Sequence, residues 1–397
     1  MEFVLERSFS LILLAAGSSS RFIKSLPPKL PPIKKQWWVY QGLALWEKVY
    51  RDFKALGCFE RIFLVVSNSL EQIYIKQALE DLELSVILGG ESRQESVLNA
   101  LKLVQTPFVV VSDVARFIGG AQMFLKMLDY FKNQPKLDGI APALSASDTM
   151  VLENQGYTLL DRAHTLHIQT PQICRTEKLK EAYSKGIFSD ESSALLSSGG
   201  QVAYIEGSLD LHKITFAQDL PPYTACLTTH TGLGFDVHGF EANKPMKIGG
   251  VLIDPKDSKE QGFKAHSDGD VLLHALMDAI LGAIKGGDIG MYFSDQNPRF
   301  KNMDSSLMLS QIYHLAQGMG HTIESIDCIL LADMPKIAPY KEAIKSRLAD
   351  LLNLNKRAIN IKATTFEGLG FIGRKEGIGA QVLVQTSALS AVDQENM

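Results

Sequence analysis

The chain has 397 residues, of which 46% are hydrophobic and 21% charged, with a formal net charge of −4. This length predicts two or three domains. The near-neutral charge and the lack of a basic cluster with interleaved aromatic residues argue against a nucleic-acid-binding protein. We find no signal-peptide pattern and no apolar run long enough for a membrane span. The four cysteines are dispersed and form no CxxC pair, so we expect a cytoplasmic protein with reduced thiols: Cys58, Cys174, Cys226 and Cys328.

From residue 8 to about 220, short apolar runs alternate with longer amphipathic ones. The runs predict buried strands at 10–16, 61–68, 84–90, 108–113 and 139–144, and helices at 70–82 and 94–104. Buried strands separated by single helices indicate parallel βαβ units, so we expect a Rossmann-like, doubly wound and mostly parallel sheet. Ligands of such sheets bind beyond the carboxyl ends of the strands.

The pattern changes near 219–230, where a Pro-Pro pair and small polar residues predict a linker. We therefore expect a first domain over 1–222, a linker over 223–230 and a second, smaller α/β domain over 231–397. In the second domain the predicted elements are helices near 270–284 and 305–320 and strands near 325–333 and 358–366.

The loop AAGSSSR (15–21) follows the first predicted strand, and its small residues would let backbone N–H groups approach a phosphate. Arg21 and the lysines at 24, 29, 34 and 35 supply positive charge for a triphosphate. The loop has neither the P-loop nor the dinucleotide-binding pattern, so a plain strand–loop–helix turn is the alternative.

Four further charged residues favour a nucleotide site, although ordinary alternatives stay open. Asp113 follows an apolar strand and is suited to hold Mg²⁺ against phosphates, with Arg116 nearby, although a helix cap is the alternative. Arg162 and Lys213 stand in weakly charged surroundings, and either could be an ordinary surface charge.

This half of the chain resembles the 2-C-methyl-D-erythritol 4-phosphate cytidylyltransferases in a series of segments taken in order: AAGSSSR, GGESRQESV (89–97), SDVAR (112–116), SDTM (147–150), the DR at 161–162, TPQ (170–172), SDESS (189–193) and the segment ending at Lys213. The resemblance covers residues 8 to about 220. It implies transfer of CMP from CTP to a sugar-alcohol phosphate, with Mg²⁺ held by Asp113. The nucleotide pocket it implies is lined by Ala15, Ala16, Gly17, Gly90, Ser96 and Thr170, with Arg116 among the substrate-binding residues.

The resemblance also implies catalytic cations. Arg21 and a lysine would stabilise charge on the α-phosphate, and Arg162 and Lys213 would orient the acceptor phosphate. The lysine is either Lys29 or Lys35, and we favour Lys35 because it keeps the usual distance to the following helix.

The segment GFDVH (234–238) starts the second predicted domain. On a strand, Asp236 and His238 point to the same side and can share a cation, although a solvent-facing polar pair is the alternative. His274, on an apolar predicted helix, is either a core residue or a third ligand; three ligands with one open position are typical of catalytic zinc. Asp278 could steady the His274 imidazole or lie on the helix surface.

Five segments of this half resemble the 2-C-methyl-D-erythritol 2,4-cyclodiphosphate synthases: GFDVH, AHSDGDVLLHAL (265–276), GDIGMYFSD (287–295), ADMPKIAPY (332–340) and KATTFEGLGFIGRKEGI (362–378). The resemblance implies that Asp236, His238 and His274 bind Zn²⁺ or Mn²⁺, and that His266 and Thr365 are catalytic. It further implies substrate contacts for Ser267, Asp288, Ile289, Gly290, Phe293, Asp295, Ala332, Pro335, Lys336, Thr364, Phe366, Glu367, Phe371 and Arg374.

Together the two resemblances imply a fused enzyme of the non-mevalonate isoprenoid pathway, acting on CTP and methylerythritol phosphates. They also imply a trimer-based homo-oligomer, expected as a hexamer, and association with the pathway kinase that acts between the two steps. Two alternatives stay open here: a nucleotide-binding regulator without turnover, and a sugar nucleotidyltransferase fused to a zinc hydrolase.

Overall fold

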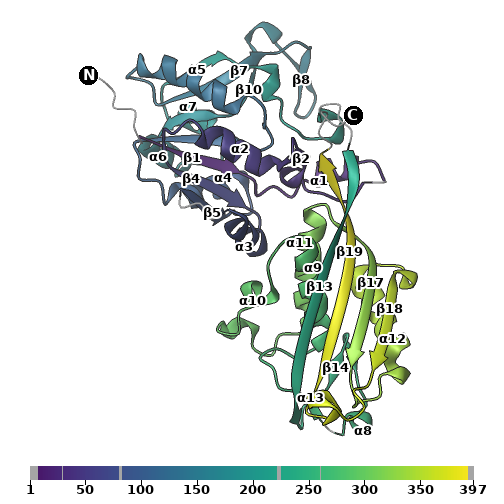
Figure 1. The fold of residues 1–397 in the computed structure, drawn as a ribbon. Helices are drawn as coiled ribbons and strands as arrows, with labels where there is room; N and C mark the ends of the chain where they lie inside the picture. The colour runs from purple at the N-terminus through teal and green to yellow at the C-terminus, as the bar shows by residue number, and fades with distance from the viewer. Residues whose placement is uncertain (1–7, 29, 80–82, 221–224, 260, 392–397) are drawn as a thin grey trace. The chain divides into compact units, whose positions relative to one another are not determined.

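The computed structural model describes residues 8–28, 30–79, 83–220, 225–259 and 261–391. The chain divides into two compact units, the first comprising 1–27, 34–72 and 79–223 and the second comprising 28–33, 73–78 and 224–397. Each unit is an α/β structure (Figure 1). Among the described residues, no helix is long and apolar enough to cross a membrane.

The first unit is built on an eight-stranded sheet in which β1, β4, β5 and β6 run parallel, as do β7 and β12. Strands β10 and β11 run antiparallel to their neighbours. The strands are β1 (Phe9–Leu14), β4 (Phe59–Val66), β5 (Leu84–Leu88), β6 (Phe108–Asp113), β7 (Gly139–Ser145), β10 (Leu166–Ile168), β11 (Gln172–Arg175) and β12 (Val202–Glu206). Two hairpins lie outside it, β2 (Val39–Tyr40) with β3 (Leu43–Ala44) and β8 (Met150–Glu153) with β9 (Tyr157–Leu160).

Helices cover both faces of this sheet. Ile12 packs into a core with α4, α6 and α7, whereas Phe9 contacts Phe124 of α5 from the other face, because odd and even residues of a strand point to opposite sides. The helices are α1 (Ser20–Ser25), α2 (Leu45–Lys54), α3 (Ser69–Ala78, of which 73–78 group with the second unit), α4 (Arg93–Leu101), α5 (Gly120–Lys132), α6 (Thr176–Tyr183) and α7 (Glu191–Ser197). The predicted doubly wound, mostly parallel sheet is therefore confirmed; the part of the predicted helix 70–82 beyond residue 79 lies outside the described residues.

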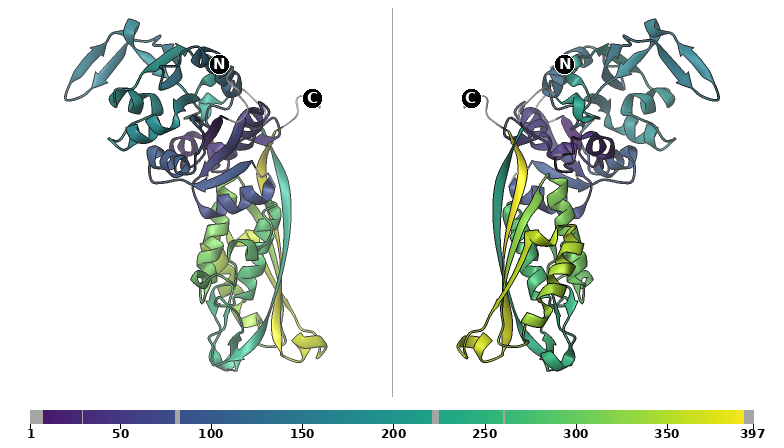
Figure 2. Two further views of the ribbon diagram at one scale, coloured as in Figure 1. Left: turned by 90° about the vertical axis from the view of Figure 1, so that its left-hand side faces the viewer. Right: turned by 90° about the vertical axis from the view of Figure 1, so that its right-hand side faces the viewer.

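The second unit contains a five-stranded sheet in the order β16-β13-β19-β17-β18. Its strands are β13 (Ala225–Ala242), β16 (Gln261–Phe263), β17 (Thr322–Leu331), β18 (Ile359–Thr364) and β19 (Gly377–Ala391), and a separate hairpin joins β14 (Lys247–Ile248) to β15 (Val251–Leu252). Figures 1 and 2 show helices packed on one face of this sheet. The helices are α8 (Pro255–Ser258), α9 (Val271–Ala283), α10 (Ile289–Tyr292), α11 (Ser305–Gly318), α12 (Lys341–Leu352) and α13 (Gly370–Gly373).

The predicted linker 223–230 differs from the structure, because residues 225–230 form the first third of β13. They pair antiparallel with residues 386–391 of β19 in an unbroken register. Small polar residues there satisfy their backbone groups in a sheet rather than in a loop. The remainder of the predicted linker lies outside the described residues, and the domain limits 1–222 and 231–397 stay a prediction.

Helix α9 lies directly against the backbone of β13, and two glycines make this approach geometrically feasible. A Cβ atom on Gly234 would lie 1.9 Å from the backbone oxygen of Ala275, and one on Gly232 would lie 1.9 Å from that of Ala279. The buried carboxylate of Asp270 caps the start of α9 by accepting from Leu273 N (3.1 Å), and it also accepts from Gly249 N (2.8 Å) in the turn between β14 and β15. Together these contacts fix the rotation and height of α9 over the strand.

We predict that Gly234→Ala destabilises the second unit by about 1–3 kcal/mol or more, because backbone atoms cannot yield to the added methyl group. Gly239→Ala on the same strand is the matched control, since its Cβ atom would meet only Glu376 O at an ordinary 3.7 Å. Thermal unfolding followed by calorimetry measures both variants. Equal melting temperatures for the two would contradict close packing of α9 on β13.

Candidate functional site

The first candidate site is a cavity of about 440 Å³ beyond the carboxyl ends of β1 and β6, a size typical of small-molecule sites. Leu14 and Asp113 are neighbours in the register of these strands, so the loop after β1 lies beside the carboxylate that ends β6. Eight residues predicted from the sequence line the cavity: Ala15, Ala16, Gly17, Lys35, Gly90, Ser96, Asp113 and Lys213.

Asp113 is buried between two cations. Its carboxylate accepts from Lys213 Nζ at 2.7 Å and lies 3.4 Å from Arg93 Nε. Burial alone would raise the pKa of Asp113, but Arg93 and Lys213 outweigh it and hold this pKa well below the usual range. The cavity floor therefore carries a carboxylate and at least two positive charges, an arrangement suited to an anionic ligand.

Lys35 lines both this cavity and an adjoining one of about 180 Å³, which residues 17–22, including Arg21, and Thr215 also line. Its Nζ donates to the backbone oxygen of Ile214 at 3.2 Å. Burial and the nearby charge of Lys213 lower the pKa of Lys35. The other lysine considered, Lys29, lies outside the described residues.

Three predicted residues of the first half do not line these cavities. Arg116 donates hydrogen bonds to the backbone oxygens of Leu211 and Ile168, and these bonds hold the loop that follows β6. Thr170 is buried, and its hydroxyl accepts a hydrogen bond from Asp113 N at 3.1 Å, so it helps to fix the backbone of Asp113. Arg162 is exposed and donates to the backbone oxygen of Ser147 at 3.3 Å.

Arg93 lines the cavity but was not among the predicted site residues. Its guanidinium makes a bidentate pair with the buried Glu191, at 2.8 and 3.1 Å, and Tyr183 Oη donates to the same carboxylate at 2.9 Å. Burial opposes its charge, but Glu191 and Asp113 raise the pKa of Arg93. Arg93 could have been predicted from the sequence, because it is the positively charged residue of the loop GGESRQE. Its pairing with Glu191 could not, because the two residues are 98 positions apart in the chain.

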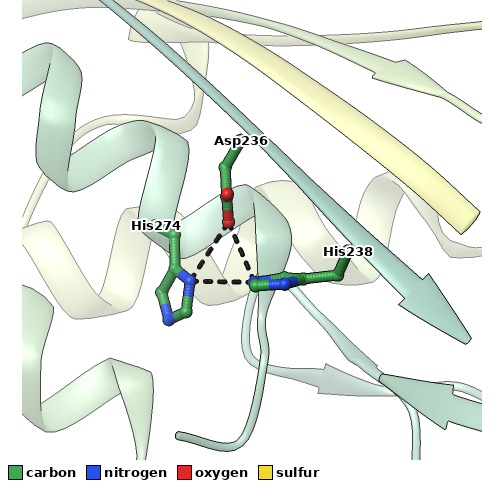
Figure 3. A group of neighbouring side chains, drawn as sticks. All are labelled: Asp236, His238 and His274. Atoms are coloured by element: carbon green, nitrogen blue, oxygen red, sulfur yellow. Dashed lines mark hydrogen bonds and ion pairs between the residues drawn. The ribbon is translucent and has the colours of Figure 1, made fainter. Parts of the chain in front are cut away.

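The second candidate site holds Asp236, His238 and His274, which converge from β13 and α9 (Figure 3). Asp236 Oδ2 lies 3.0 Å from His238 Nε2 and 3.1 Å from His274 Nδ1, and the two nitrogens are 3.1 Å apart. Within the part of the chain that the structure describes, these side chains form a group in which one atom of each lies within 4.8 Å of the others. One carboxylate oxygen and two imidazole nitrogens are a donor set that Zn²⁺ accepts, so the residues fit a divalent metal.

A cavity of about 530 Å³ opens beside this triad. Six further predicted residues line it: His266, Ser267, Ile289, Gly290, Phe293 and Asp295. His266 Nε2 is buried without a hydrogen-bond partner among the described residues, and a ligand in the cavity could satisfy it. The predicted Asp288 stands at the start of α10, next to the lining residues.

Sequence reasoning missed several lining residues of the second cavity, among them Lys264, Gln296, Phe300 and Met308. Lys264 stands two residues before His266, and this closeness in sequence could have indicated a positively charged group near that histidine. Phe300 and Met308 are distant in sequence from the motifs and carry no local signal. Asp278 takes neither role expected for it, because its carboxylate accepts from Ile289 N at 2.8 Å and so fixes the start of α10; burial raises its pKa.

Besides Asp288, nine predicted residues of the second half lie outside this cavity, near the ends of β17 and β18 and on the segment before β19. Here Thr365 Oγ1 donates to Glu367 at 2.6 Å, Arg374 pairs with Glu376 at 2.8 Å, and Phe366 N donates to Asp333 at 2.9 Å. The nine are Ala332, Pro335, Lys336, Thr364, Thr365, Phe366, Glu367, Phe371 and Arg374.

Comparison with known proteins assigns both halves. Residues 9–229 match the family model of 2-C-methyl-D-erythritol 4-phosphate cytidylyltransferase, and residues 229–387 match that of the YgbB family. The bifunctional enzyme IspD/IspF of Wolinella succinogenes is 38% identical over 385 residues, covering 95% of this chain and 96% of the relative. That of Aliarcobacter butzleri is 40% identical over 378 residues, covering 94% and 96%.

The chain belongs to the bifunctional IspD/IspF family. The solved structure of the bifunctional IspDF from Campylobacter jejuni agrees, with 38% identity, a TM-score of 0.71 and coverage of 96% of this chain and 99% of that chain. Both resemblances drawn from the sequence are thereby confirmed. Like other IspD/IspF enzymes, the chain combines cytidylyltransferase and cyclodiphosphate synthase activities of the isoprenoid pathway.

We predict that Glu191→Gln costs about 3–5 kcal/mol of stability in the first unit, because Arg93 would keep a half-buried charge without its bidentate partner. Glu181→Gln is the control, since Glu181 forms an exposed pair with Lys185 and should leave the melting temperature unchanged. Calorimetric unfolding of both variants is the measurement. A Glu191→Gln melting temperature equal to that of the wild type would show that the pair does not hold Arg93.

Proposed function

We propose that the first cavity binds CTP and 2-C-methyl-D-erythritol 4-phosphate, with Ala15, Ala16, Gly17, Gly90 and Ser96 around the nucleotide. The observation that carries this proposal is the gathering of Lys35, Lys213 and Arg93 around Asp113 in one cavity. A triphosphate needs this density of positive charge. Asp113 is suited to hold Mg²⁺ once the nucleotide brings it.

The reaction needs positioning more than it needs a base. The acceptor phosphate is already ionised near pH 7, so its oxygen can attack the α-phosphorus directly while the bond to pyrophosphate breaks. Lys35 and Arg21 would stabilise the growing negative charge, and Lys213 would orient the acceptor phosphate. Because the pKa of Asp113 is low, its carboxylate stays negatively charged. It therefore holds the Lys213 ammonium group in position before the acceptor binds.

We propose that the second cavity binds 4-CDP-2-C-methyl-D-erythritol 2-phosphate. Asp236, His238 and His274 would hold Zn²⁺ or Mn²⁺, which supplies charge screening between two anionic phosphorus centres. His266 and Ser267 line the same cavity and would contact the 2-phosphate. An oxygen of that phosphate attacks the β-phosphorus, the ring closes and CMP leaves with the bonding electrons.

The nine predicted residues near the ends of β17 and β18 and before β19 fit this proposal when a neighbouring copy supplies them. Exposed apolar side chains support contact between copies, since such surfaces mark interaction sites. On β13 and β19 they are Leu227, Leu233, Phe235 and Leu383; on the β8–β9 hairpin and β10 they are Val151, Leu152, Tyr157, Leu159 and Leu166. We infer trimeric contacts through the first set and dimeric contacts through the second, which would also bring the exposed Arg162 to a neighbour's site and give a hexamer.

The product of the first site must gain a phosphate before it becomes the substrate of the second. A kinase therefore acts between the two steps, and its association with this chain stays a prediction from the sequence. A cytoplasmic location likewise stays a prediction.

We expect sedimentation equilibrium to give a mass about six times the 43.8 kDa of one chain. A charged residue at both Leu233 and Phe235 should reduce the mass to that of a dimer, whereas Leu307→Asp, at an exposed apolar residue of α11, should leave it unchanged. A monomeric wild type would overturn the assembly.

The central test separates the two activities. Asp236→Ala should lower the cyclase rate by about 10²–10³-fold and spare CMP transfer, and Lys35→Ala should do the reverse. Lys24→Ala is the control for the lysine, because Lys24 is exposed on α1 and lines neither described cavity of the first unit. Each reaction is followed by phosphorus NMR on the full chain.

Two outcomes would contradict the proposal. Absence of both activities in the wild type would favour a nucleotide-binding regulator. Release of free phosphate instead of a cyclic diphosphate would favour a zinc hydrolase.

A further inference from the structure

The imidazole of His274 has a second nitrogen that the metal triad does not use. Nδ1 faces Asp236 and His238, while Nε2, on the other side of the ring, lies 3.0 Å from Ser305 Oγ and 3.1 Å from Ser267 Oγ. A neutral imidazole carries its proton on one nitrogen only. For Nδ1 to offer a lone pair to a metal, Nε2 must carry that proton and donate it.

Ser305 can only accept this proton. Its hydroxyl donates to Asp268 Oδ1, and its backbone N–H donates to the same oxygen at 3.2 Å. The side chain is fully buried at the first position of α11, so no solvent can replace these partners. Because its single proton is committed to Asp268, the Ser305 oxygen faces His274 with a lone pair.

Asp268 is held in place from its other side. Lys247 Nζ lies 3.4 Å from Asp268 Oδ2 and 3.1 Å from Asp304 Oδ2, and Asp268 N donates to Met303 O at 3.2 Å. The carboxylate therefore receives the Ser305 proton as a charge-assisted hydrogen bond in a fixed direction.

The two serines near His274 Nε2 differ in what they can do. Ser267 lines the second cavity, accepts from Gly269 N at 3.2 Å, and keeps its proton for a ligand. Ser305 does not line that cavity, and both its proton and its lone pair are used inside the protein. Fixing the ring is therefore the task of Ser305.

We propose that Ser305, oriented by Asp268, is a positioning residue that holds His274 as the tautomer with Nδ1 free for a metal. The inference rests on the proposed metal site at Asp236, His238 and His274. Helix α11 thereby has a role in the proposed metal site, because its first residue, Ser305, contacts His274 on the side of the ring that faces away from Asp236 and His238. Partners of this kind typically change metal affinity by about 10–100-fold.

The test titrates Co²⁺ into metal-free full-length protein and follows the visible absorption of the bound ion. Ser305→Ala should weaken Co²⁺ binding by about 10–100-fold and change the absorption bands, because the ring can then rotate or change tautomer. Ser310→Ala on the same helix is the matched control and should bind like the wild type. The melting temperature of each metal-free variant separates a loss of fold from a loss of ring orientation.

Asp268→Asn provides a second variant that leaves the contact with His274 unaltered. An amide oxygen is a weaker acceptor for the Ser305 proton, so we expect a smaller loss of Co²⁺ affinity in the same direction. Co²⁺ affinities of Ser305→Ala and Asp268→Asn within twofold of the wild type would overturn the inference. If the wild type bound Co²⁺ no better than Asp236→Ala, the proposed metal site itself would fail.

Discussion

Helix α9 meets strand β13 at backbone distance, and the chemistry of the second unit depends on this contact. Gly232 and Gly234 leave no side chain between the two elements, so the helix axis lies close enough for His274 to reach Asp236 and His238. Any larger residue at either glycine would lift the helix and separate His274 from Asp236 and His238. Asp270 adds the second restraint by capping the helix one turn before His274.

In the first unit, ion pairs rather than close backbone packing hold the site residues in place. A parallel sheet delivers Asp113 and the loop after β1 to the same edge, but the carboxylate would be costly to bury alone. Arg93 and Lys213 offset that cost, and Glu191 in turn fixes Arg93. The resulting network is organised before any ligand arrives, which is what a reaction driven by positioning and electrostatic stabilisation requires.

Much of both sites could be predicted because the relevant spacing is local. Asp113 follows an apolar run that ends at a sheet edge, and Asp236 and His238 alternate on one strand, so their directions follow from strand geometry alone. The pairing of Arg93 with Glu191 could not be predicted in this way, since it joins residues 98 positions apart. The role of Asp278 was left open for a similar reason: its partner, Ile289 N, lies at the start of α10, outside the helix that carries Asp278.

The linker was misjudged because composition indicates how readily a segment turns, but does not show whether a distant strand is available to pair with it. Residues 225–230 found such a partner in β19. Arg162 and the group around Thr365 illustrate a further limit: one chain alone does not place them at a cavity, and our assignment of their roles depends on neighbouring copies.

Crystals of the wild type grown with Zn²⁺ and measured on both sides of the zinc absorption edge test the central claim most directly. We predict an anomalous peak in each chain about 2.0–2.2 Å from Asp236 Oδ2, His238 Nε2 and His274 Nδ1, with a fourth position facing the cavity. A peak elsewhere, or none at these three atoms, would contradict the account.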